Sequence, residues 1–62
     1  MTGYYYTVED RSYDRLIGEY LSYRQALKEY NKVSREEFYV SIGLYRNSQT
    51  DENDRDLLRV TN

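Results

Sequence analysis

The stretch DRSYDRLIGEYLSYRQALKEYNKV, residues 10–33, decides the fold of this chain. Its apolar residues recur every three or four positions, which places six of them at the a and d sites of successive heptads: Tyr13, Leu16, Tyr20, Tyr23, Leu27 and Tyr30. Polar and charged residues take most of the remaining positions. This periodicity is typical of a helix that buries one stripe and exposes the other. It predicts a single long helix over residues 10–33.

A second interpretation of the same stretch begins a shorter helix further along. Gly18 lies in the middle of the long helix, where glycine costs about 1 kcal/mol relative to alanine. Ser22 and Gln25 have the spacing of a capping box, which starts a helix. Residues 15–21 would then form a strand and residues 23–32 a short helix, giving the order hairpin, helix, hairpin. Two adjacent apolar pairs within residues 15–21 spoil strand alternation, so the long helix is preferred.

The segment before this stretch favours a strand. Residues 4–8 read Tyr-Tyr-Tyr-Thr-Val, all types that are enriched in strands. Side chains alternate between the two faces of a strand, so one face would carry Tyr4, Tyr6 and Val8 and the other would carry Tyr5 and Thr7.

Residues 38–46 fit either a strand or a helix. Alternating apolar positions predict a strand that faces the helix with Phe38, Val40, Ile42 and Leu44. Against this, Ser34 and Glu37 have capping-box spacing, and Val33 and Phe38 could form a hydrophobic staple. Gly43 and the β-branched residues are poor helix formers, which favours the strand.

The rest of the chain completes a small two-layer α+β fold. Residues 47–56 are polar and acidic and predict a loop, and residues 57–60 predict a closing strand with Leu58 and Val60 inward. The expected architecture is one domain over residues 1–62 with the order strand, long helix, strand, strand. The alternatives are an all-α helical hairpin with a short third helix, and the hairpin–helix–hairpin order.

The residue types argue against catalysis and metal binding. The 62 residues include no cysteine and no histidine, which excludes disulfides and the usual zinc sites and removes the commonest general base. So short a chain also has little wall with which to build a dry cleft. The acidic run 51–56 departs from a calcium loop, because Arg55 takes a ligand position and Asp56 replaces the required glycine. We therefore expect no enzymatic activity, metal or cofactor.

Charge and hydropathy bear on location and partners. Nine cationic and eleven anionic side chains give a formal net charge of −2, too balanced for bulk attraction to nucleic acid or anionic membrane. No apolar run approaches the roughly 20 residues that span a bilayer, and no signal-peptide pattern follows Met1. The expected location is the cytoplasm of a cell or of an infected host cell.

The best candidate site is the face of the predicted sheet that points away from the helix. Tyr5, Tyr39 and Tyr45 would lie on it beside Arg59. Tyrosine and arginine are enriched in protein-binding surfaces, because they supply rigid contact area and hydrogen bonds. These four residues predict a site for a larger protein partner, although cross-strand stabilisation would explain exposed tyrosines equally well.

Two alternatives belong to other functional classes. A basic stripe on the helix could contact nucleic acid phosphates through Arg24, Lys28, Lys32 and Arg35, although cations near a helix C-terminus also complement its dipole. A homodimer could instead form along the helix seam, through Tyr20 and Leu27.

In size, composition and lack of catalytic groups, the chain resembles the small accessory proteins of phages and mobile elements. Many of those proteins bind and inhibit a host protein. The resemblance implies a non-enzymatic module that binds and modulates a host protein through a tyrosine-rich surface.

Overall fold

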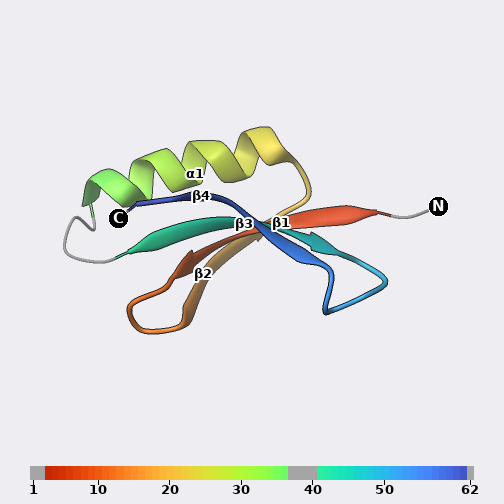
Figure 1. Cartoon of the computed structure of the whole chain (residues 1–62). Helices are drawn as coiled ribbons and strands as arrows, with labels where there is room; N and C mark the ends of the chain where they lie inside the picture. The colour runs from red at the N-terminus through yellow and green to blue at the C-terminus, as the bar shows by residue number, and fades with distance from the viewer. Residues whose placement is uncertain (1–2, 37–40, 62) are drawn as a thin grey trace.

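The computed structural model describes residues 3–36 and 41–61. Its elements, in chain order, are β1 (Tyr4–Asp10), β2 (Arg15–Tyr20), α1 (Tyr23–Glu36), β3 (Ile42–Ser48) and β4 (Arg55–Val60) (Figure 1). The described residues thus form four antiparallel strands and one helix. The predicted α+β class is confirmed, and the all-α alternative is not supported.

The strands form one sheet in the order β2–β1–β3–β4. β2 and β3 each pair antiparallel with β1, so they run parallel to each other, and α1 lies in the connection between them (Figure 1). β3 pairs antiparallel with β4, which leaves β2 and β4 as the two edges of the sheet. This is the hairpin–helix–hairpin order that the sequence offered as an alternative.

The predicted helix over residues 10–33 is wrong in its first half, where the chain makes a β-hairpin. The buried carboxylate of Asp10 ends β1, and its Oδ1 accepts hydrogen bonds from the amides of Ser12 at 3.0 Å and Tyr13 at 3.3 Å. Asp14 then adopts a left-handed φ of 52°, a conformation that aspartate tolerates better than most residues. The side chain of Tyr13, predicted to lie in the apolar seam, is 74% exposed in this turn.

A β-bulge explains why residues 15–21 lack clean alternation. The register between β1 and β2 steps from Val8 opposite Gly18 to Glu9 opposite Leu16, so Ile17 is an extra residue in β2. An extra residue lets two consecutive side chains be accommodated where a regular strand would alternate them. Ile17 packs against the core, while Leu16 is 52% exposed. The adjacent apolar pair therefore did not exclude a strand.

Ser22 marks the start of the helix, as the capping-box alternative predicted. Its hydroxyl oxygen accepts a hydrogen bond from the Gln25 amide at 3.4 Å, and its carbonyl accepts one from Ala26 at 3.1 Å. α1 continues to Glu36, past the predicted end. Ser34 lies inside this helix and donates to the Asn31 carbonyl, so no second helix begins there. The staple residue Phe38 lies outside the described residues.

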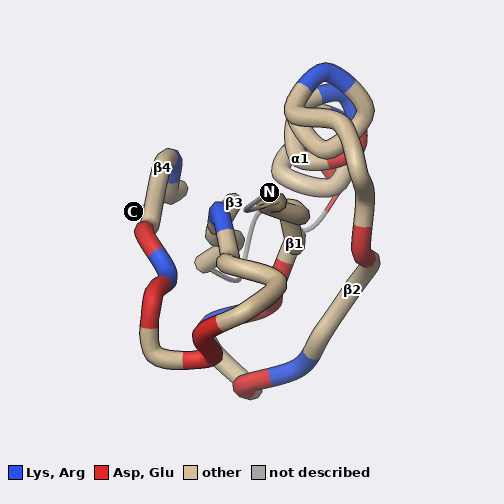
Figure 2. Tube along the Cα trace, turned by 90° about the vertical axis from the view of Figure 1, so that its right-hand side faces the viewer, with Lys and Arg blue, Asp and Glu red and all other residues tan. Residues whose placement is uncertain are grey.

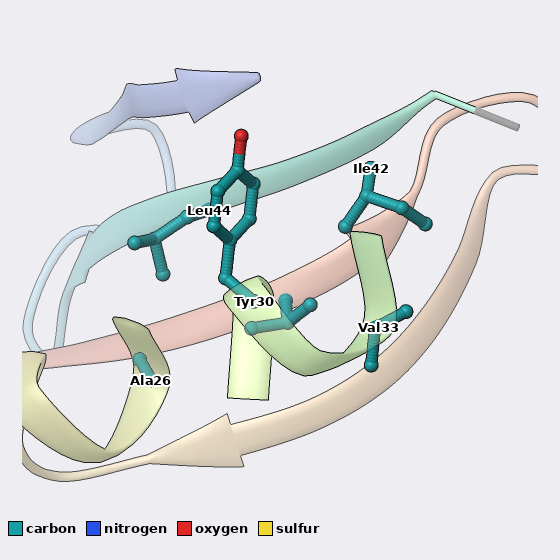
Figure 3. Close-up of a cluster of buried hydrophobic side chains, with 6 residues drawn as sticks. Ala26, Tyr30, Val33, Ile42 and Leu44 are labelled. Atoms are coloured by element: carbon teal, nitrogen blue, oxygen red, sulfur yellow. The ribbon is translucent and has the colours of Figure 1, made fainter. Parts of the chain in front are cut away.

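The core lies between α1 and one face of the sheet. Ala26, Tyr30 and Val33 of α1 pack against Ile42 and Leu44 of β3 (Figure 3), with Val8 of β1 completing the buried cluster. Ile42 and Leu44 thus face the helix, as predicted. Partly buried apolar residues surround this cluster: Tyr6, Ile17, Tyr20 and Leu27. The two residues of the predicted dimer seam, Tyr20 and Leu27, therefore pack within the chain itself.

β4 differs from the closing strand that the sequence predicted. The predicted loop over residues 47–56 is shorter in the structure, because β3 continues to Ser48 and β4 already begins at Arg55. A bulge shifts the register from Tyr45 opposite Leu57 to Leu44 opposite Arg59. Val60, predicted to point inward, pairs with Gly43 and is 40% exposed, and Leu58 is also exposed. The helix lies over β1, β2 and β3, whereas β4 extends beyond it (Figure 2).

Candidate functional site

The face of the sheet opposite α1 is not covered by another layer of the described residues. We call it the open face. Its members follow from the register, because they alternate with the buried pair Val8 and Leu44. The three strands β1, β3 and β4 contribute Tyr5, Thr7, Glu9, Gly43, Tyr45, Asn47, Arg55, Leu57 and Val60.

The centre of the open face is a stack of arginine on tyrosine. The guanidinium carbon of Arg55 lies 4.0 Å from the centre of the Tyr45 ring. One nitrogen of the same guanidinium, Nη2, lies 2.7 Å from Glu9 Oε2, which joins β4 to β1 across β3. A cation over an aromatic face and a charge-assisted hydrogen bond both favour this one position of the arginine.

Hydrogen bonds extend this stack into a network. The Thr7 hydroxyl donates to Glu9 Oε2 at 2.8 Å, and Asn47 Nδ2 donates to the Thr7 oxygen at 3.1 Å. Thr7 and Asn47 are both buried. The polar groups that hold Arg55 are therefore themselves held, which orders the surface before any partner arrives.

Gly43 lets the side chains of the open face lie close to the backbone. A Cβ at this position would stand 2.9 Å from Tyr45 Cε1, 3.0 Å from Arg11 Cδ and 3.2 Å from Leu57 Cδ1. Distances this short require the neighbouring groups to move. Glycine is therefore needed here for close approach, in a position where its φ is not positive.

Exposed aliphatic side chains surround the stack. Leu57, opposite Tyr45, is 43% exposed, and Val60 lies on the same face. Leu16 of β2, opposite Glu9, extends the apolar area toward the other edge. The open face thus combines a rigid aromatic–arginine centre with apolar contact area.

The structure places the four residues predicted for protein binding in different surroundings. Tyr5 and Tyr45 lie on the open face, and Tyr39 lies outside the described residues. The predicted position of Arg59 is wrong, because the bulge in β4 turns its side chain toward the helix. Its Nε donates to the Tyr23 hydroxyl at 3.2 Å, and this hydrogen bond raises the pKa of Arg59.

Sequence reasoning missed Arg55 and Glu9. Arg55 fell in a segment assigned to a loop, and the carboxylate that holds it is 46 residues away. The available signal for β4 was the alternation of polar and apolar residues. Residues 55–58 read Arg-Asp-Leu-Leu, so two charged residues followed by two apolar ones obscure that alternation.

The predicted basic stripe lies along the exposed side of α1. Lys28, Lys32 and Arg35 line an open groove of about 810 Å³ between the helix and Tyr20, and Arg24 is exposed one turn earlier. Two glutamates, Glu29 and Glu36, line the same groove, so its charge is mixed. Burial, and secondarily the Glu29 carboxylate, raises the pKa of Tyr20 above its ordinary value.

A second arginine stacks on the helix side of the sheet. The Arg46 guanidinium lies 4.9 Å from the Tyr4 ring centre and 2.7 Å from Asp56 Oδ2. Tyr6 contacts Tyr23 edge to face, with ring centres 5.7 Å apart. Arg46 and Arg55 therefore each lie between a tyrosine ring and a carboxylate.

Two further properties concern membranes and metals. Along residues 3–36 and 41–61, no helix has the length and apolar character to cross a membrane. In the same part of the chain, no three acidic side chains converge as metal ligands do.

Comparison with protein-family models, with curated proteins and with solved structures finds no match to this chain.

Proposed function

We propose that this chain is a small protein-binding module without enzymatic activity, and that it recognises a larger protein partner through the open face. The observation that carries the proposal is the Tyr45–Arg55–Glu9 stack beside exposed Leu57 and Val60. Tyrosine and arginine dominate the energetics of protein interfaces when they are held rigid within an apolar surround.

Order in the unbound chain supports this function. Long side chains lose about 0.5–1.5 kcal/mol each when an interface immobilises them. Arg55 already has one position, set by the Tyr45 ring and by Glu9, so a partner does not have to order it. The cost of binding is correspondingly lower.

The test is affinity capture from cell lysate with a tagged chain, using Tyr45→Ala and a matched control. Tyr13→Ala is the control, because Tyr13 is also a tyrosine but lies in the β1–β2 turn, is 74% exposed and makes none of the contacts of the stack. We expect one dominant protein to be captured by the wild type and by Tyr13→Ala. Tyr45→Ala should weaken capture about tenfold or more, as loss of a central aromatic does.

Each capture is repeated at high salt and after nuclease treatment. Capture that disappears with nuclease would favour the helix stripe and nucleic acid, whose binding falls steeply with salt. Light scattering of the purified chain tests the homodimer. Circular dichroism shows whether Tyr45→Ala is folded, and the milder Leu57→Ser is used if it is not. Equal capture by wild type and by folded open-face variants would refute the proposal.

A further inference from the structure

One end of the open face carries a tyrosine ring between two grooves. Tyr5 lines a groove of about 340 Å³ together with Glu19, Leu21 and Gln49. It also lines a second groove, of about 510 Å³, formed with the β3–β4 loop and including Glu52. Tyr5, which is partly exposed, therefore borders a groove on each side of its strand.

The carboxylates at these grooves have no cationic partner in the described part of the chain. The ion pairs there involve three other carboxylates, those of Glu9, Asp10 and Asp56. Asp51, in the second groove, accepts the Asn53 amide within its own turn. All three charges remain unneutralised by a cation, and only Glu19 and Glu52 also lack a hydrogen-bond partner within residues 3–36 and 41–61; the two grooves place them on opposite sides of Tyr5.

The same sheet shows how tyrosine and carboxylate are used together elsewhere. Arg55 lies over Tyr45 and pairs with Glu9, and Arg46 lies over Tyr4 and pairs with Asp56. At Tyr5 the ring and the carboxylates recur, but no arginine among residues 3–36 and 41–61 stacks on the ring.

The sign of the charge around Tyr5 follows from how the charged residues are distributed between the helix and the rest of the described chain. Outside α1, the described residues include eight carboxylates and five arginines, whereas α1 carries four cations and two glutamates. Figure 2 shows acidic residues in both hairpin loops with arginines interspersed among them, and basic residues on the helix. The grooves at Tyr5 therefore lie on the acidic layer, where a basic segment is attracted and a nucleic acid is repelled.

We propose that Tyr5, flanked by Glu19 and Glu52, is the seat for an arginine of a basic segment in the protein partner. The guanidinium would stack on the ring and pair with the carboxylates, and the exposed Leu21 would cover the aliphatic stem of the arginine. This inference rests on the proposed function and names the partner's chemistry at one end of the open face.

The probe is a blocked pentapeptide of alternating glycine and arginine, titrated into the ¹⁵N-labelled chain and followed by NMR. We expect amide shifts clustered at the residues of both grooves, and binding that weakens with added salt because exposed charges are screened. A peptide with citrulline in place of arginine keeps the shape but lacks the charge, and it should not bind.

Three variants separate the contributions to this binding. Tyr5→Leu keeps an apolar side chain but removes the aromatic face, and should weaken binding about two- to fivefold. Glu19→Gln should weaken it by a similar factor, as loss of an exposed ion pair does. Asp14→Asn is the control, because it removes the same charge from a turn where asparagine suits the φ of 52°. It should bind as the wild type does.

Several results would overturn the inference. Shifts spread over all carboxylates, equal binding of the citrulline peptide, or a loss in Asp14→Asn as large as in Glu19→Gln would each show general attraction to acidic surface. Unchanged binding in Tyr5→Leu would remove the ring from the site. If Tyr45→Ala abolishes partner capture while Tyr5→Leu and Glu19→Gln leave it unchanged, this inference fails and the proposed function stands. If no protein is captured, the proposed function fails, and binding of the arginine peptide then shows only that the surface around Tyr5 holds a guanidinium, without a protein partner.

Discussion

Substituting Gly18 with alanine distinguishes the hairpin from the long helix by the sign of the stability change. In the observed fold Gly18 lies in β2 opposite Val8, and the Tyr20 ring lies over it. A Cβ at Gly18 would overlap the Tyr20 hydroxyl and would stand 2.8 Å from its Cζ and 3.1 Å from its Cε2. The ring must therefore move away.

The magnitude follows from what Tyr20 loses. Its ring packs against the core cluster but is only partly buried, so displacing it costs at most the roughly 1.5–3 kcal/mol of a fully buried side chain. Replacing a strand glycine by alanine returns roughly 0.5–1 kcal/mol of backbone entropy. We therefore expect Gly18→Ala to lower the free energy of unfolding by up to about 2 kcal/mol. In a helix over residues 10–33 the same change would raise it by about 1 kcal/mol.

Urea unfolding followed by far-UV circular dichroism measures this difference, and a double-mutant cycle with Tyr20→Ala identifies its cause. Once the ring is absent, the alanine at position 18 has nothing to displace, and it should be neutral or stabilising. A change in melting temperature of roughly 4–8 °C per kcal/mol is expected for a domain of this size. If Gly18→Ala stabilises the chain in both backgrounds, the hairpin and the contact with Tyr20 are wrong.

Four further predictions concern the turn, the core, the open face and pH. Asp10→Ala removes the acceptor of two turn amides and should cost about 1–3 kcal/mol in urea unfolding, more than Asp10→Asn, which keeps that acceptor; equal costs would contradict this. Leu44→Ala should lower the free energy of unfolding by about 2–5 kcal/mol. That is a large share of the roughly 3–9 kcal/mol of total unfolding free energy expected for 62 residues. A folded variant of near wild-type stability would refute the core position of Leu44. Gly43→Ala should displace the Tyr45 ring, 2.9 Å from the added carbon, and weaken partner capture as much as Tyr45→Ala does; undiminished capture would separate ring position from binding. Burial raises the pKa of Tyr20, so the stability that its neutral phenol contributes is present below the unfolded-state pKa and is lost as pH rises through the folded-state value. Unfolding free energies between about pH 9 and pH 11 should therefore fall more steeply in wild type than in Tyr20→Phe.

Part of the fold follows directly from local sequence signals. Alternation places Val8, Ile42 and Leu44 on one face of their strands, and all three are buried. Ser22 has the residue type and spacing of a helix cap, and α1 begins at the next residue. These signals need only neighbouring residues, so a single sequence contains them.

The error over residues 10–22 has a physical origin in the bulge. An apolar spacing of three and four fits a helix, but it also fits a hairpin in which one strand carries an extra residue and the turn carries a tyrosine. Ile17 supplies the extra residue and Tyr13 lies in the turn. What distinguishes the two is the hydrogen bonding of Asp10 to the turn amides, which periodicity does not detect.

Of the residues in the candidate site, only the tyrosines were predictable from the sequence. Strand alternation assigns Tyr5 and Tyr45 to the open face without knowledge of the fold. The partners of Tyr45 depend on strand order, because Glu9 reaches Arg55 only when β3 lies between β1 and β4. No local pattern encodes that order.

The tyrosines explain how the sheet can have one face that the other described residues leave uncovered. No second layer of the described residues covers this face, and an aliphatic surface without cover would favour aggregation. Arg55 instead covers Tyr45, and Glu9 holds the arginine in place. The same contacts that make the open face tolerable in water also make it rigid, so stability and recognition depend on shared residues. Glu9→Gln separates the two effects, because it loosens Arg55 while leaving the Tyr45 ring. The glutamine oxygen still accepts the Thr7 hydroxyl, so folding loses mainly the attraction of a partly exposed ion pair, about 0–1 kcal/mol. A larger loss in partner affinity than in stability would therefore show that the fixed position of the arginine is what the partner recognises.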